Sequence, residues 1–217
     1  ATVANDATVA DATSANDATV ADATSANLKM SIKLEKTLLE EQKQEIQSKI
    51  NNEGLWLGYE AGLLTDEEFR DLLRDKLDLD CSNDEFDQAF SALLLDFPAN
   101  VYSFLHELTS NFDLYLLSNT SVIHSRIFLN NQLGPKGENL FGLFKKAHFS
   151  YEMGLVKPNP LIYQQVLKEN NLKAEEIVFF DDNAANIESA STLGIDSILI
   201  DPTTSFSQIS TKINALC

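Results

Sequence analysis

The sequence predicts an α/β fold, in which helices cover a parallel β-sheet and a helical block is inserted near the N-terminus. Two observations predict it. From residue 101 onward, short apolar strands alternate with helices at close spacing, which is typical of a parallel sheet with crossover helices. Between residues 34 and 95, by contrast, the pattern is helical and lacks strands.

The composition supports this fold class and limits the partners. The chain has 217 residues and is 44% hydrophobic, enough for the core of one domain with an insertion. The net charge is −17, from 16 Lys+Arg and 33 Asp+Glu, which argues against binding to nucleic acid or to an anionic membrane. A phosphorylated substrate remains compatible, because a local metal ion or lysine can dominate the charge of one cleft.

The cysteines and the apolar runs indicate the cellular compartment of the protein. Cys81 and Cys217 lie far apart and show no metal-binding spacing, so we expect free thiols in a reducing compartment. No apolar run reaches the length of a membrane span, and no secretory signal is visible at the N-terminus. We therefore expect a cytoplasmic protein.

Residues 1–27 differ from the rest of the chain. The eleven letters "DATVADATSAN" occupy residues 6–16 and recur at residues 17–27, and only small side chains appear. Three interpretations compete: a disordered tag or tail, a genuine repeat, or letters that do not reflect the native side chains.

The helical block is expected to begin with a helix over residues 34–50. Two capping boxes, each a Ser or Thr followed three residues later by Glu, open further helices. They are Thr65 with Glu68, before a helix to about Leu77, and Ser82 with Glu85. Residues 96–100 contain Pro98 and are expected to form a hinge.

The remaining elements form the expected sheet and its covering helices. We expect strands at residues 113–119, 143–151, 176–182 and 196–200, and helices at residues 101–110, 120–133, 159–171 and 183–194.

Polar side chains stand at or just past the ends of these strands, where ligands bind in open α/β sheets. They are Ser118-Asn119-Thr120, Lys157 in "GLVKPNP", and Asp181-Asp182. Taken singly, each has an ordinary explanation, as a helix N-cap, a solvated lysine, or an N-cap aspartate beside a solvated one.

The chemistry of these residues is nevertheless suited to a phosphate. A hydroxyl and an amide can donate hydrogen bonds to its oxygens, and a lysine supplies a point charge. Adjacent carboxylates raise each other's pKa and require a positive partner. Two carboxylates at a strand end suit Mg²⁺, which prefers oxygen ligands.

The three clusters together, as "LLSNTS", "GLVKPNP" and "VFFDDNAANIESA", resemble the haloacid dehalogenase (HAD) superfamily of hydrolases from roughly Glu35 to the C-terminus. The similarity is closest to members with a small helical cap, among them sugar-phosphate phosphatases and the phosphatase domain of epoxide hydrolases. "YEAGLLTDEEFRDLL" looks like that cap. The resemblance implies a Rossmann-like core at residues 28–33 and 96–217, a cap at residues 34–95, and residues 1–27 in place of the first core strand.

The resemblance also implies an activity. It is that of a Mg²⁺-dependent phosphatase that acts on a small phosphorylated metabolite through an aspartyl phosphate. Ser118, with Asn119 beside it, would bind phosphate, and Lys157 would steady the nucleophile and the phosphate. Asp181 and Asp182 would hold Mg²⁺. Neither the substrate nor the oligomeric state follows from the sequence.

The family pattern also requires a strand that ends in Asp-x-Asp within about the first thirty residues. The aspartates there, Asp6, Asp11, Asp17 and Asp22, are spaced five or six apart, so none forms that pair. The sequence therefore names no nucleophile and no general acid. Because loss of a central strand would leave its neighbours unpaired, we predict that part of residues 1–27 occupies that strand and that its letters are not the native ones.

Three other functions compete. A 2-haloacid dehalogenase has the same fold but needs no metal, which the Asp181-Asp182 pair counts against. A non-catalytic protein could bind phosphate and metal without a nucleophile, and the literal sequence supports that alternative. A phospho-receiver domain would need its acid pair early and its lysine late, the reverse of the order found here.

Overall fold

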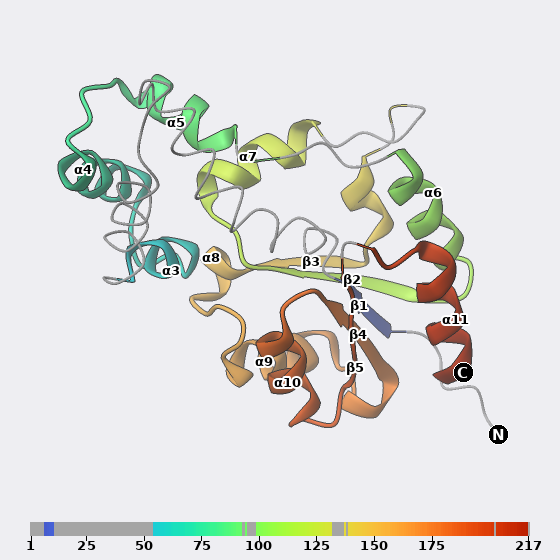
Figure 1. The fold of residues 1–217 in the computed structure, drawn as a ribbon. Helices are drawn as coiled ribbons and strands as arrows, with labels where there is room; N and C mark the ends of the chain where they lie inside the picture. Colours follow the sequence, from blue (N-terminus) through green and yellow to red (C-terminus); the bar gives the residue numbers. More distant parts are fainter. Residues whose placement is uncertain are drawn as a thin grey trace.

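A five-stranded parallel sheet with helices on both faces forms the core of the protein (Figure 1), and the predicted α/β class is confirmed. The computed structural model describes residues 7–10, 54–92, 94, 99–131, 137, 139–201 and 203–216. Among these residues, no helix is long and apolar enough to cross a bilayer.

The strands are in the order β3-β2-β1-β4-β5, and every neighbouring pair is parallel. Their bounds are β1 Ala7–Ala10, β2 Asp113–Ser118, β3 Lys146–Phe149, β4 Ile177–Asp181 and β5 Asp196–Leu199. Ala7 is in register with both Asp113 and Ile177, and Ala10 with Phe180. The carboxyl ends of β2, β1 and β4 therefore lie side by side at one edge of the sheet.

The central strand comes from the repeat. Residues Ala7–Ala10 pair with β2 on one side and β4 on the other. Central parallel strands are usually rich in Val, Ile and Leu, whereas this one reads Ala-Thr-Val-Ala. That the letters of the repeat are not native stays a prediction, and the helix expected at residues 34–50 lies outside the described residues.

Helices cover both faces of the sheet (Figure 1). The core helices are α6 Ala99–Leu108, α7 Val122–Asn131, α8 Ser150–Met153, α9 Pro160–Asn170, α10 Ala184–Ser191 and α11 Phe206–Leu216, with short 3₁₀ turns η1 Leu140–Leu143 and η2 Ala174–Glu176. Because side chains alternate along a strand, Tyr115 and Leu117 of β2 pack with α9 and α10. Leu114 and Leu116 face the opposite way and pack with α6 and α11.

Three elements differ from the sequence predictions. The strand expected at residues 143–151 is shorter, because η1 ends at Leu143 and α8 begins at Ser150. Helix α6 begins at Ala99, inside the expected hinge. Helix α11 was not predicted: its Ser- and Thr-rich sequence has weak helix propensity, and burial of Ile209 and Ile213 against the sheet stabilises it.

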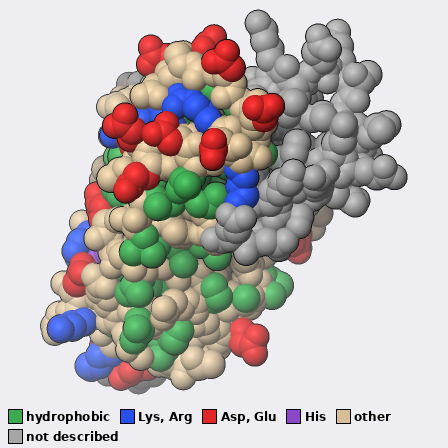
Figure 2. All heavy atoms as spheres, turned by 90° about the vertical axis from the view of Figure 1, so that its left-hand side faces the viewer, with side chains coloured by type: hydrophobic (Ala, Val, Ile, Leu, Met, Phe, Trp, Pro, Cys, Tyr) green, Lys and Arg blue, Asp and Glu red, His purple; other side chains and the backbone are tan. Residues whose placement is uncertain are grey.

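The region predicted as a cap, residues 34–95, contains the helices α3 Leu55–Glu60, α4 Asp66–Leu77 and α5 Asn83–Ser91 among the described residues, and we call these three helices the cap. Both predicted capping boxes are present, at Thr65 with Glu68 and at Ser82 with Glu85. An aromatic cluster fills its interior, with Tyr59 stacked on Phe69 at a centroid distance of 4.0 Å. Acidic side chains cover the outer surface of α4 and α5 (Figure 2). The sequence boundaries of the cap stay a prediction.

Candidate functional site

A buried ion pair joins two of the predicted site residues at the carboxyl edge of the sheet. Asp181 is the last residue of β4, and Lys157 lies in the loop after α8. Lys157 Nζ lies 2.8 Å from Asp181 Oδ2, and both side chains are buried. The ammonium also lies 5.8 Å from the centre of the Phe179 ring. Lys157 thus provides a positive partner for the carboxylate of Asp181, the first of the two adjacent acids.

The carboxylate of Asp181 is fixed by further donors. The backbone N–H of Asn183 donates to Asp181 Oδ1 at 2.7 Å. The side-chain Nδ2 of Asn186 lies 3.0 and 3.1 Å from the two carboxylate oxygens of Asp181. Asn186 lies in the first turn of α10, and its carbonyl accepts a hydrogen bond from the Tyr163 hydroxyl at 3.1 Å. Asn183 and Asn186 therefore hold the Asp181 carboxylate at the start of α10, a contact that the sequence did not predict.

The end of β2 positions the lysine. Ser118 is the last residue of β2 and is fully buried. Asn119 Oδ1 accepts a hydrogen bond from the Lys157 amide at 2.8 Å, and Asn119 Nδ2 donates to the Lys157 carbonyl at 3.0 Å. This two-way contact ties the Lys157 loop to β2. The predicted roles of Ser118 and Asn119 in binding substrate stay predictions.

A second pair of hydrogen bonds links the loop after β2 to the start of α8. The Thr120 amide donates to Ser150 Oγ at 2.9 Å, and Ser150 Oγ donates back to the Thr120 carbonyl at 3.1 Å. Both residues are buried. The loop after β2 is therefore held against the start of α8 as well as against the Lys157 loop.

The two acids suit a magnesium ion. Mg²⁺ is usually held by one or two protein carboxylates together with water and substrate phosphate, and Asp181 and Asp182 offer two hard oxygen donors at the sheet edge. In the part of the chain that the structure describes, no group of three His, Cys, Asp or Glu side chains could enclose a metal. Two carboxylates supply only part of the coordination shell that Mg²⁺ requires.

The cap is fastened to the core through α7. The Ile123 amide donates to the Tyr59 hydroxyl at 3.4 Å, and that hydroxyl donates to Asp66 Oδ1 at 2.8 Å. Arg126 of α7 forms an ion pair with Asp66 at 2.8 Å. Because α7 directly follows the loop after Ser118, these contacts place the cap beside the site.

His124 packs at the same junction. Its Nε2 lies 3.1 Å from the Phe90 carbonyl, and its ring stacks on the Phe90 ring at 4.1 Å. Burial lowers the pKa of His124 from 6.5 to about 4. The structure thus places His124 in the packed junction between the cap and the core.

The depressed pKa predicts a pH-dependent stability. Between about pH 4 and 6.5 the unfolded chain binds more protons at His124 than the folded chain, so stability falls as the pH falls through this window. We expect a loss of up to about 3 kcal/mol by pH 4. Urea unfolding of wild type and His124→Gln at a series of pH values would measure this loss. The free energy of unfolding of His124→Gln should depend less steeply on pH than that of wild type.

The comparison with the variant isolates His124 from other groups. Burial also lowers the pKa of His148, so the wild-type slope contains both residues. The prediction is wrong if His124→Gln and wild type lose stability in parallel as the solution is acidified.

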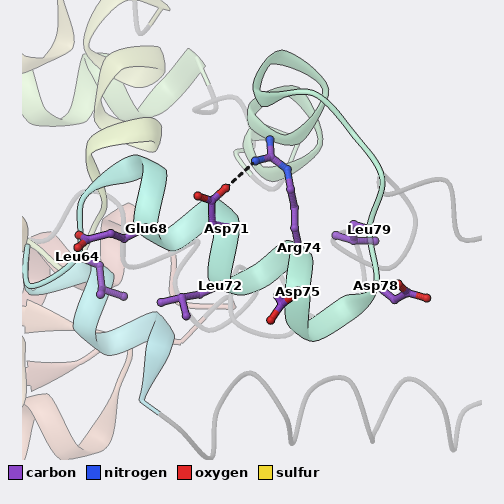
Figure 3. A pocket seen from close by; sticks show the side chains of 8 residues that line it. All are labelled: Leu64, Glu68, Asp71, Leu72, Arg74, Asp75, Asp78 and Leu79. Atoms are coloured by element: carbon purple, nitrogen blue, oxygen red, sulfur yellow. Dashed lines mark hydrogen bonds and ion pairs between the residues drawn. The ribbon is translucent and has the colours of Figure 1, made fainter.

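A separate hollow lies on the cap and contains none of the predicted site residues. It is lined by α4 and the adjoining turns (Figure 3), namely by Leu64, Glu68, Asp71, Leu72, Arg74, Asp75, Asp78 and Leu79. Arg74 turns its guanidinium toward Asp71, at 3.1 Å, and also donates to Asn83 of α5 at 2.6 Å. This hollow is part of the cap surface, remote from the Lys157–Asp181 pair in sequence and in the elements that form it.

Three features together indicate one protein family. They are the order of the strands, the acid pair at the end of β4, and Lys157, which precedes that pair in the sequence. Residues 7–194 match the haloacid dehalogenase-like hydrolase family, and the chain belongs to it. The resemblance inferred from the sequence motifs is thereby confirmed.

Three matches with known proteins illustrate what this chain is similar to. D-ribitol-5-phosphate phosphatase of Bacteroides thetaiotaomicron is 26% identical over 149 residues, which are 69% of this chain and 72% of that protein. A HAD family enzyme from the same organism, solved in complex with magnesium and inorganic phosphate, matches with a TM-score of 0.77 and 26% identity over 94% of this chain and 98% of that one. Drimenol cyclase of Aspergillus calidoustus is 30% identical over 151 residues, 67% of this chain but only 27% of that protein.

Proposed function

We propose that the protein is a Mg²⁺-dependent phosphatase that hydrolyses a small phosphorylated metabolite. The observation that carries this proposal is the buried Lys157–Asp181 pair, with a distance of 2.8 Å, at the sheet edge where β2 also ends in Ser118. A relative that is a phosphatase, and a related enzyme solved with magnesium and inorganic phosphate, support it.

Each residue has a proposed role in binding the phosphate. Lys157 places its charge beside the phosphate oxygens, and Ser118 and Asn119 supply a hydroxyl and an amide at the end of β2. Asp181 and Asp182 hold the metal, with Asp181 oriented by Asn183 and Asn186. Bound Mg²⁺ would neutralise negative charge on the phosphate.

The register of the sheet suggests a nucleophile. Asp11 follows Ala10 in the sequence, and Ala10 is in register with Phe180, the residue before Asp181. Asp11 itself lies outside the described residues. If the letters of the repeat are the native ones, we propose that the Asp11 carboxylate attacks phosphorus, that the bond from phosphorus to the alcohol oxygen breaks, and that water then hydrolyses the aspartyl phosphate.

The sequence departs from the family pattern at the general acid. Thr13 stands two residues after Asp11, where the family pattern has a second aspartate. The alcohol that leaves must then take its proton from another group, and loss of a general acid typically costs 10² to 10⁴ in rate. We therefore expect slow turnover of alkyl phosphates if the literal sequence is that of the protein.

A pair of variants tests the proposal. Asp11 and Asp22 occupy the same position in the two copies of "DATVADATSAN", so Asp22→Asn is a control in identical sequence context. We expect phosphate release that depends on Mg²⁺ and is abolished by EDTA. Asp11→Asn should lower its rate by at least about 10³-fold, whereas Asp22→Asn should leave the rate unchanged. Acid quenching of the reaction with a substrate that carries a labelled phosphoryl group should trap a phosphoenzyme in wild type and not in Asp11→Asn.

The alternatives give different results in the same experiment. A protein that binds Mg²⁺ and phosphate without any hydrolysis would be a non-catalytic member of the family. Metal-independent turnover of a 2-haloacid would indicate a dehalogenase. Intact mass and N-terminal peptide sequencing of the same preparation would show whether the repeat is present in the protein.

A further inference from the structure

The hollow on α4 groups several apolar side chains at the surface of the cap. Its volume is about 750 Å³, many times the roughly 30 Å³ that one water molecule occupies in the liquid. Leu72 is 43% exposed there, whereas Leu73, its neighbour in the sequence, is buried in the aromatic cluster of the cap. Leu64 and Leu79 line the same hollow. Single exposed leucines are common on protein surfaces, but leucines gathered in one hollow indicate a surface that binds a partner.

Acidic side chains alternate with leucine along this face of α4. Glu68, Leu72 and Asp75 follow one another at i, i+4 and i+7, a spacing that places them on one side of a helix. Figure 3 shows Leu64, Leu72 and Asp75 on the same side of α4. A partner that fits this face should therefore carry basic side chains beside apolar ones.

Residues 34–50 of this chain, which lie outside the described residues, carry the complementary pattern. The sequence predicts a helix there, and one face of that helix combines lysine with apolar side chains. Its members, at i, i+3, i+7, i+10 and i+14, are Lys36, Leu39, Lys43, Ile46 and Ile50. This spacing is typical of a helix face that packs along another helix. The four glutamates of the segment fall outside this face, so the face matches α4 both in charge and in apolar character.

The segment joins the cap next to the hollow. Ile50 precedes Leu55, the first residue of α3, by five residues, so the two lie at most about 18 Å apart. A Cβ built on Gly58, within α3, would lie 3.9 Å from Leu64 Cδ1, so α3 borders the hollow at the end where α4 begins. A helix over residues 34–50 is about 25 Å long and α4 is about 18 Å long, so the segment is long enough to cover the hollow.

We propose that residues 34–50 form a helix that docks antiparallel to α4 in the hollow, with Leu39 against Leu72. In this arrangement the two isoleucines of the segment lie toward Leu64 and the start of α3. The parallel arrangement would place Ile50 beyond the far end of α4, farther from α3 than the connecting chain reaches. This docking is independent of the proposed phosphatase function.

Opposite charges fix the direction and the register of the docked helix. In the antiparallel direction, Lys43 lies beside Glu68. Lys36, two turns away, lies beside Asp75. Exposed ion pairs stabilise little, whereas like charges brought together by a shifted register disfavour it. The charges therefore contribute specificity, and the apolar contacts contribute the stability of the docked state.

Disulfide cross-linking tests the docking and its register. In a background that carries Cys81→Ala and Cys217→Ser, the pair Leu39→Cys and Leu72→Cys is oxidised at low protein concentration. A disulfide needs Cα atoms within about 7 Å of each other, so the docked helix should close this bridge within one chain. We expect this pair to close at least about 10-fold faster than two control pairs.

The control pairs each move one cysteine away from the docked face of its helix. One pair combines Leu39→Cys with Glu67→Cys, at an exposed position five residues before Leu72. The other combines Leu72→Cys with Thr37→Cys, two residues before Leu39. Similar closure rates in all three pairs would overturn the inference. Bridges that form mainly between two chains would also overturn it, because the occupant of the hollow would then be a second copy.

Thiol labelling measures the docking without a cross-link. In the same background, Leu72→Cys should react with a maleimide at least about 10-fold more slowly than Glu67→Cys. Leu39→Asp places a carboxylate against the leucines and should remove this protection, whereas Thr37→Asp should keep it. Cooperative urea unfolding of the Leu39→Asp protein would show that the loss of protection is local. Protection that survives Leu39→Asp would assign the hollow to another occupant and overturn the inference.

Discussion

Replacement of Lys157 with methionine should strongly lower the proposed phosphatase activity and destabilise the fold. The ammonium lies 2.8 Å from Asp181 Oδ2, and both side chains are about 1% exposed. Methionine fills a similar volume but leaves a buried carboxylate without its opposite charge. Loss of one partner of such a pair costs about 3 to 5 kcal/mol. Urea unfolding at pH 7 would measure this cost.

The expected effect on activity has a separate origin. A positive charge placed where the phosphate binds stabilises the charge that develops in the transition state, and loss of one such group typically costs about 10²- to 10³-fold in kcat. Phosphate release by Lys157→Met at saturating Mg²⁺ would measure the loss. A residual rate within threefold of wild type would refute the role of Lys157.

The double variant Lys157→Met with Asp181→Asn separates the two effects. It removes both charges, so it should recover part of the lost stability because no uncompensated carboxylate remains. It should not recover activity, since the proposed phosphate site still lacks its lysine. If the double variant is no more stable than Lys157→Met, the ion pair is not the source of the destabilisation.

Replacement of Gly62 with alanine should disturb the cap–core junction more than any other single methyl group added to a described glycine. Its Cβ would lie 2.2 Å from the Tyr151 carbonyl oxygen, which is backbone and cannot rotate away. The positive φ of +68° adds a further cost of about 1 to 2 kcal/mol. We expect a total loss of about 2 to 5 kcal/mol, or displacement of the cap with a corresponding loss of kcat/KM.

Gly154→Ala provides the matched control. Gly154 has nearly the same φ, +69°, but a Cβ there would meet no described atom within 4 Å. It therefore carries the backbone cost without the steric clash. Denaturant unfolding and kcat/KM of both variants would separate the two costs, and equal behaviour of Gly62→Ala and Gly154→Ala would show that the clash with Tyr151 has no effect.

The sequence alone determined the features that depend on local chemistry. The two capping boxes form as predicted, because each bonds residues only three apart. The alternation of strands and helices after residue 101 predicted the parallel sheet, since each element carries its own periodicity. The order of Ser118, Lys157 and the Asp181-Asp182 pair along the chain predicted the family.

Only the tertiary structure decided the features that depend on residues far apart in the chain. Ala7–Ala10 form the central strand because β2 and β4 bond them from both sides, not because their letters favour a strand. Helix α11 is stabilised by burial against the sheet rather than by propensity. The pairing of Lys157 with Asp181 spans 24 residues, and the hydrogen bond from the Ile123 amide to the Tyr59 hydroxyl joins the core to the cap. Such contacts follow from how the elements pack, which a local pattern does not encode.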